Sequence, residues 1–375
     1  MRHSRMLNPK SDLIAALPFL LPMAYVPILA IAAAYGGWTL WIAPFYGIVL
    51  SSFMDRVFGE NDSNIDPQTP DAELFWRRLI VLIWLPIQAA ILVFILYAAT
   101  HFAHLNWHER LGLVAETGLV TGAVGIVFAH ELIHQKNRWE QRLGEWLLIS
   151  VLYGHFKSEH VIVHHRFVGT PRDPVTARYN ESFYHFFARV LPGCVVSAWA
   201  AEKERLTLNG LPIWHQSNPF WRYGTGQFLV LAAAGIIGGW PGVGYFILQA
   251  FVAVLVLEQV NYTEHYGLTR QLLPSGKYEP VRPHHSWNAA HRITNYLLIN
   301  LQRHSDHHAR PDRRYPLLQT YSATDAPQLP YGYPIMSAMA FNPWLWRRVM
   351  NKRVRQWRKD HYPDVMDWPA TAENP

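Results

Sequence analysis

The chain has 375 residues, of which 50% are hydrophobic and only 16% are charged, against roughly 25% charged residues in soluble domains. This composition excludes a disordered or collagen-like chain, and the single cysteine, Cys194, excludes a disulfide framework and any cysteine-ligated zinc or iron–sulfur domain within the chain. The net charge of +6, with Arg2, Arg5 and Lys10 at the start of the chain, indicates basic residues beside a membrane rather than a nucleic-acid-binding tail.

Long runs without charge predict helices that span a membrane. Apart from Glu116, no acidic or basic residue interrupts residues 13–54, 79–100, 111–129 and 223–257. A spanning helix needs about 20 apolar residues, and glycines at 36–37 and 238–242 divide the two longest runs. We therefore predict an all-α integral membrane protein with six spans, at about 13–34, 38–54, 79–100, 111–130, 223–239 and 242–262.

The basic N-terminus predicts the orientation of these spans. It should remain in the cytoplasm, which places residues 131–222 and 263–375 on the cytoplasmic side of the inner membrane. We expect a single multi-pass domain, 1–375, in which these two segments form a helical, histidine-rich cap. Buried helices of a large soluble protein are the alternative, but uncharged runs of this length are rare in such folds.

Nine of the 20 histidines lie at predicted span ends or in the cap, in three clusters and one isolated position. In His130-Glu-Leu-Ile-His134, residues i and i+4 share one helix face and can reach one metal. Adjacent histidines of the other clusters point about 100° apart on a helix, so each could turn toward a different ion. The candidate ligands are His130, His134, His160, His164, His165, His265, His304, His307 and His308.

Nine imidazoles are too many for one ion, since zinc usually takes four ligands. Iron with open coordination positions is the usual choice for activating dioxygen, so two iron ions are the prediction. Four neighbouring acids could orient the imidazoles through their free N–H groups, or could be solvated charges of the cap: Glu131, Glu159, Glu264 and Asp306.

The other histidines have no ligand-like spacing. We expect exposed positions for His101, His104 and His108 in an outward loop and for His3, His185, His215 and His361. Polar cap residues, or groups behind the ligands, are the interpretation of His155, His284, His285 and His291.

The motifs HELIH, HVIVHH and HSDHH resemble the three histidine boxes of the membrane desaturase and hydroxylase superfamily. NYTEHYGL at 261–268, HSWN at 285–288 and NLQRHSDHHARPDRRYPLLQ at 300–319 resemble the membrane-bound alkane 1-monooxygenases of bacteria more specifically. The resemblance implies six membrane helices and a di-iron centre on the cytoplasmic side, held by the nine histidines. It also implies that one oxygen atom of O2 is inserted into the terminal C–H bond of a medium-chain linear alkane, giving a primary alcohol. Electrons would come from an NADH-dependent reductase through rubredoxin, which must act in trans because Cys194 is alone.

An alkane has no polar group that the protein could hydrogen-bond, so its selection must depend on the shape of an apolar slot. Span two offers slot candidates, which could equally face lipid: Trp38, Trp41, Phe45, Ile48, Leu50 and Phe53. The basic, tryptophan-containing stretch 343–363 predicts a helix on anionic lipid, or a docking surface for an acidic electron carrier.

Several alternatives remain open. A fatty-acyl desaturase or hydroxylase, or a xylene-type monooxygenase, would share the fold and the metal. HELIH also matches the zinc-peptidase pattern with Glu131 as the base, but this leaves seven clustered histidines unexplained. A metal transporter would place its ligands near the middle of the bilayer, whereas these lie at span ends.

Overall fold

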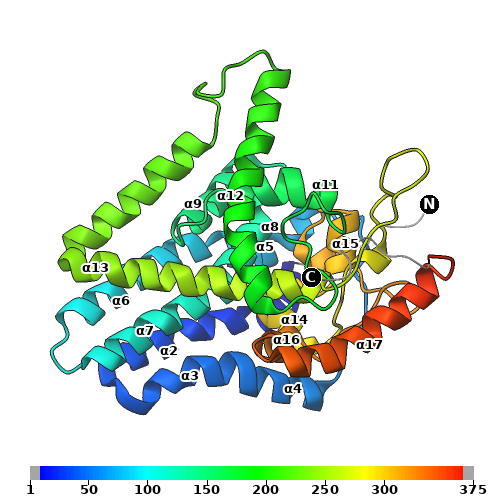
Figure 1. Ribbon diagram of the computed structural model, residues 1–375. Coiled ribbons are helices and arrows are strands. Elements are labelled where there is room, and N and C mark those ends of the chain that lie inside the picture. The colour runs from blue at the N-terminus through cyan, green and yellow to red at the C-terminus, as the bar shows by residue number, and fades with distance from the viewer. Residues whose placement is uncertain (1–8, 366–375) are drawn as a thin grey trace.

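A bundle of long apolar helices carries a helical cap at one end. The computed structural model describes residues 9–365, and in that range the chain forms helices and turns without a β-strand (Figure 1). The all-α prediction is confirmed. Arg2, His3 and Arg5, to which the sequence assigned a place at the membrane or the surface, lie outside the described residues.

Five helical segments in the described range are long and apolar enough to cross a membrane: Asp12–Tyr35, Gly37–Phe58, Asp71–His101, Trp107–Ile133 and Phe220–His265. Their α-helical parts are α1 (Pro9–Ala16), α2 (Tyr25–Tyr35), α3 (Ile42–Pro44), α4 (Ser51–Phe58), α5 (Phe75–Leu82), α6 (Trp84–His101), α7 (Trp107–Val120), α8 (Val127–Ile133) and α13 (Phe220–His265). The helices α6 and α7 pack against α13, and α2 packs against α6 and α7 (Figure 1). The protein is therefore a multi-pass membrane protein.

The count of five differs from the predicted six because α13 is counted as one helix, although two helices meet at a kink inside it. It has 46 residues, or about 70 Å at 1.5 Å per residue, which is about twice the 30 Å of a hydrocarbon core. Gly238 and Gly239 are non-helical, so the helix bends where the sequence analysis placed a break, and the bend is visible at the left of Figure 1. Six crossings remain a proposal.

The tight turn at Gly36 and Gly37, between the first two apolar segments, contacts the start of α7. Gly36 ends α2 with a φ of 61°, and the neighbouring Gly37 N–H donates to Glu109 Oε1 at 2.7 Å. A Cβ added at Gly36 would approach Glu109 Oε1 to 2.8 Å. Glycine is therefore needed here both for its positive φ and for space.

The cap consists of short helices and one long one. These are α9 (Arg138–Ile149), α10 (Phe156–Ser158), α11 (His165–Phe167), α12 (Phe183–Leu208), α14 (Arg292–Leu297), α15 (His304–Ala309), α16 (Tyr333–Ala340) and α17 (Pro343–His361). In Figure 1, α12 stands across the direction of the spans.

Buried polar contacts fix the cap to the bundle. Arg314 pairs with Asp71 and Glu140 at 2.8 Å each. Asp55, near the end of the second apolar segment, accepts hydrogen bonds from the backbone N–H groups of Ile293 and Thr294 at 2.6 and 3.1 Å. Asp71 is largely exposed, but Arg314, Glu140 and Asp55 are buried, so the loss of a partner at these three would leave a costly unpaired group.

Candidate metal centre and apolar cavity

The nine histidines gather at the end of the bundle in two groups. Within each group, the ligand atoms lie within 4.8 Å of one another. The first group contains His130, His134, His160, His165 and His307, and the second contains His164, His265, His304 and His308. The isolated His265, at the end of α13, thus joins residues from the second and third boxes.

A π-helical turn explains why the histidines of the second box, HVIVHH at 160–165, are divided between the two groups of histidines. Glu159–His164 is π-helical, and this geometry repeats after five residues rather than four. His160 and His165 consequently lie on one side, with their Nε2 atoms 3.1 Å apart, while His164 turns to the second group. In the third box, α-helical spacing pairs His304 with His308, and His307 faces the first group.

The imidazoles point their Nε2 atoms at each other. Four Nε2–Nε2 distances are 3.0–3.1 Å: His160–His165, His165–His307, His265–His304 and His304–His308. The buried Nε2 atoms of His134 and His164 have no hydrogen-bond partner. Buried nitrogens left without partners are costly, and a transition-metal ion is the group that converging imidazoles bind best. The residues therefore fit two metal ions.

Burial favours the neutral, metal-binding form of these side chains. Desolvation, followed by the influence of neighbouring histidines, holds the pKa of His160, His165 and His307 well below the usual value. The same causes lower the pKa of His304 and His308. These five imidazoles are neutral at pH 7, and neutral imidazole is the form that ligates metals.

Two carboxylates contact the outer nitrogens of the second group. Asp173 lies 3.0 Å from His164 Nδ1 and also accepts from the Thr176 hydroxyl at 2.7 Å. Glu264 Oε1 lies 3.3 Å from His304 Nδ1, but neither atom forms a hydrogen bond. A carboxylate hydrogen-bonded to a histidine ligand, as Asp173 is to His164, fixes the ring orientation and raises the basicity of the ligand. Glu264 was a candidate from the sequence, whereas Asp173 was missed because it lies in a loop without regular spacing from the histidines.

The other predicted acids lie close to the histidines but have different contacts. Glu131 accepts from the Tyr315 N–H at 3.2 Å and from Gln135 Nε2 at 3.0 Å. Asp306 pairs with Arg313. Both oxygens of Glu159 are buried without a hydrogen-bond partner.

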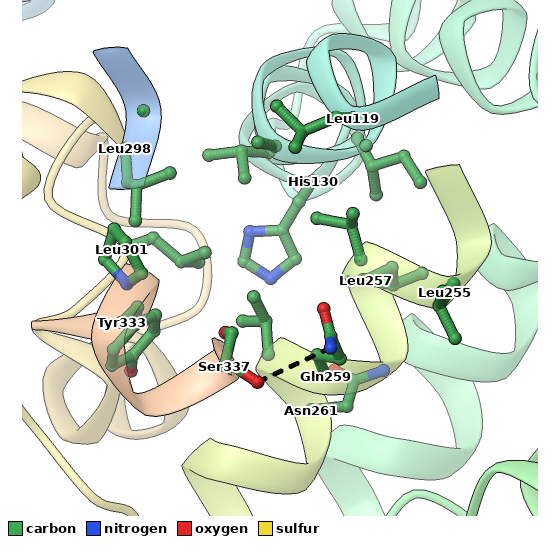
Figure 2. A pocket seen from close by; sticks show the side chains of 18 of the residues that line it. Leu119, His130, Leu255, Leu257, Gln259, Asn261, Leu298, Leu301, Tyr333 and Ser337 are labelled. Carbon is green, nitrogen blue, oxygen red and sulfur yellow. Dashed lines mark hydrogen bonds between the residues drawn. The ribbon is translucent and has the colours of Figure 1, made fainter. Parts of the chain in front are cut away.

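An apolar cavity of about 460 Å³ leads to the histidines. Its lining includes His130, His160 and His304, which come from both groups. Figure 2 shows the His130 ring pointing into the cavity between leucines of several segments. All three π-helical segments contribute to the wall: Phe45–Leu50, Thr121–Ile126 and Glu159–His164. Such π-helical turns occur frequently at functional sites.

The slot candidates of span two divide between the cavity and the outer surface. Ile48 and its neighbour Gly47 line the cavity. Trp41 and Phe45 do not, and their side chains are 73% and 52% exposed. Of the remaining candidates, Trp38, Leu50 and Phe53 are also exposed. These outward residues face the surroundings of the bundle, where lipid would lie. The sequence missed the larger share of the wall, from α7, α13 and α16.

The histidines outside the boxes are separate from the two groups. His101, His104, His108 and His185 are exposed, and His155, His215, His291 and His361 are partly exposed. His284 and His285 form a third group with Glu279. The Tyr362 hydroxyl occupies its centre, 3.1 and 2.7 Å from the two Nε2 atoms, so these histidines hold the cap together.

The comparisons with known proteins agree with this architecture. The fatty acid desaturase family matches residues 107–339. Alkane 1-monooxygenase 1 of Pseudomonas aeruginosa is 41% identical over 325 residues, covering 86% of this chain and 84% of that protein. The chain belongs to the alkane 1-monooxygenase family. Alkane 1-monooxygenase 2 of the same organism is 39% identical over 320 residues, covering 84% of each chain.

A more distant relative is the xylene/toluene monooxygenase hydroxylase component of Pseudomonas putida. It is 26% identical over 335 residues, covering 86% of this chain and 85% of that protein. As an alkane 1-monooxygenase family member, the chain is an oxidoreductase, which confirms the resemblance and the enzyme class predicted from its motifs.

Proposed function

We propose that the protein is a non-haem di-iron monooxygenase that converts a linear, medium-chain alkane to its primary alcohol. The observation that carries the proposal is the apolar cavity whose lining includes histidines of both groups. A molecule without polar groups is selected by the shape of such a cavity. A chain entering it end first would bring its terminal methyl to the histidines.

The number of imidazoles favours iron over zinc. The two groups contain five and four histidines, whereas a catalytic zinc site usually has three protein ligands. Iron accepts imidazole ligands and is the usual metal for activating dioxygen. We therefore assign one iron to each group of histidines, with all nine side chains as ligands.

A zinc peptidase would need Glu131 beside the ion as a base. Instead, the Glu131 carboxylate accepts hydrogen bonds from Tyr315 and Gln135, and both histidines of HELIH share their group with three others. The contacts of the whole cluster therefore support oxygen chemistry rather than peptide hydrolysis.

The iron pair would supply the reduction and cleavage of dioxygen. The reaction takes one alkane, one O2, two electrons and two protons, and gives one primary alcohol and one water. The chain itself contributes the apolar wall, which excludes bulk water and orients the substrate. It also contributes the carboxylate of Asp173, which orients His164. Rubredoxin, reduced by an NADH-dependent reductase, is the proposed electron donor in trans.

The proposed setting is the inner membrane. A single domain, 1–375, would cross it six times, with α13 counted twice, and the histidine end would face the cytoplasm, where the soluble electron donor is found. The basic surface of α17 could contact either that donor or anionic lipid, as the sequence suggested.

The test combines a metal count with a product assay. Purified protein, reconstituted with rubredoxin, its reductase and NADH, should convert dodecane to 1-dodecanol. An unsaturated acyl product from an acyl substrate, with no alcohol from dodecane, would instead support a desaturase.

A further inference from the structure

A second cavity, of about 360 Å³, lies behind the second histidine group. Its walls are the loop 169–178, the residues that follow α13, and the α12 face around Val196. It shares no lining residue with the apolar cavity. Nothing in the proposed oxidation uses this space.

The lining of this second cavity is strongly positive. Four arginines and one aspartate contribute to it, which leaves a net charge of +3. Arg189 is neutralised by Glu181, at 2.7 Å. Among residues 9–365, the side chains of Arg172, Arg178 and Arg270 form no ion pair.

Unpaired cations are fewer in a larger polar cavity of about 700 Å³ on the cap. Four of its five cationic side chains form ion pairs, and the exception is Arg310. For example, Arg314 contacts Asp71 and Glu140, and Lys136 contacts Asp312. The second cavity therefore has three unpaired arginines where the larger cavity has one.

Two buried donors face the second cavity without partners. The Thr269 hydroxyl and the Arg270 Nε form no hydrogen bond, and Thr269 is only 8% exposed. Both residues line the cavity. A buried donor without an acceptor is costly, and an anion with several oxygens would satisfy both donors at once.

Stacking and backbone contacts hold the cationic wall in place. The Arg172 guanidinium lies 3.9 Å from the centre of the Phe167 ring. The Arg270 backbone N–H donates to the Gly169 carbonyl at 2.8 Å, and its Nη2 donates to the Arg166 carbonyl at 3.2 Å. A preorganised guanidinium loses little freedom on binding, and its planar fork matches the geometry of phosphate.

We propose that this cavity binds a phosphate group. The favoured source is the headgroup of an anionic phospholipid, because Val196 lines the cavity while remaining 67% exposed on α12, next to the 43% exposed Val195. These valines offer an apolar path for an acyl chain beside the cationic wall. Free phosphate has the same recognition chemistry and is the other source to test. Asp173 forms part of the wall and contacts His164, so the bound group would lie close to the second histidine group.

The first experiment measures inorganic phosphate binding to the detergent-purified, iron-loaded protein by calorimetry at low ionic strength. We expect one saturable site, weakened about tenfold or more in Arg270→Gln, since a hydrogen bond to a charged group is lost. Arg138→Gln is the control, because Arg138 is exposed on α9 outside the cavity and its replacement causes the same change in charge. If Arg270→Gln does not fold, Thr269→Val and Arg172→Gln replace it.

The second experiment identifies the source by native mass spectrometry after exchange into phosphatidylglycerol or phosphatidylcholine. Retention of one phosphatidylglycerol per chain, lost in the cavity variant, supports the lipid. Phosphate binding without preferential lipid retention supports a soluble phosphate compound. The proposal is overturned if neither ligand binds, or if Arg138→Gln weakens binding as much as the cavity variants.

Discussion

Replacing Asp173 by asparagine tests whether carboxylates orient the ligands of the second histidine group. The carboxylate is 3% exposed and accepts from His164 Nδ1, the Thr176 hydroxyl and the Val175 N–H at 3.0, 2.7 and 3.0 Å. Asparagine has nearly the same shape but only one acceptor oxygen. His164 and Thr176 share one carboxylate oxygen, Oδ2, and the Val175 N–H bonds the other. The substitution therefore removes the negative charge. It also places an NH2 group either against the Val175 N–H or against both His164 and Thr176.

The expected effect is a loss of iron from the second group. Removing the partner of a metal-bound histidine typically costs about 10–100-fold in metal affinity, which corresponds to about 1.4–2.7 kcal/mol. Titration with a chelator should release iron from Asp173→Asn at correspondingly lower chelator concentration, while the protein remains in the membrane.

Asp55→Asn is the matched control. Asp55 is also buried, at 4% exposure, and also accepts three hydrogen bonds, from Ile293 and Thr294, but it contacts no histidine of either group. It should lower thermal stability without changing the chelator titration. Wild-type iron retention in Asp173→Asn, or equal loss from both variants, would refute the orienting role.

Three further predictions concern the ligands, the cavity and the cap. His307→Ala should lose iron and activity while still inserting in the membrane, because the substitution removes one nitrogen from the first group of histidines. Full activity of this variant in membranes would show that His307 is not a ligand. A side chain added at Gly47 would collide with the Tyr25 hydroxyl at the cavity wall. Gly47→Val should therefore shift product formation toward shorter alkanes in a mixed-substrate assay. An unchanged product ratio would contradict the placement of the substrate in this cavity. The pKa of Glu279 is lowered to about 2, because hydrogen bonds from His285, Gln271 and Tyr362 outweigh the opposing effect of burial. The stabilisation of the fold by this carboxylate is therefore complete above about pH 4.5 and is lost as the pH falls through 2. Glu279→Gln should flatten the dependence of thermal stability on pH in that window.

The spans and the histidine clusters could be read from the sequence for simple physical reasons. Uncharged runs of 20 residues or more are stable in lipid mainly as helices, and paired histidines at regular spacing are uncommon elsewhere. The sequence did not show which histidines of the second box belong to which of the two groups. His160 and His165 share a group because a π-helical turn, which helix periodicity does not predict, separates them by five residues.

The substrate cavity was harder to predict than the metal centre. Every residue of span two is apolar over its central part, so periodicity does not distinguish the cavity face from the lipid face. Trp41 and Phe45 consequently looked equivalent to Ile48, although only Ile48 lines the cavity. Asp173 was missed for another reason, since loop residues come into contact with distant helices only through the tertiary fold.

The metal content of the purified protein tests the central claim most directly. Elemental analysis of protein produced in iron-replete cells should give two iron atoms per chain and negligible zinc. One zinc per chain, or the absence of stoichiometric iron in active preparations, would contradict the assignment of the nine histidines to an iron pair.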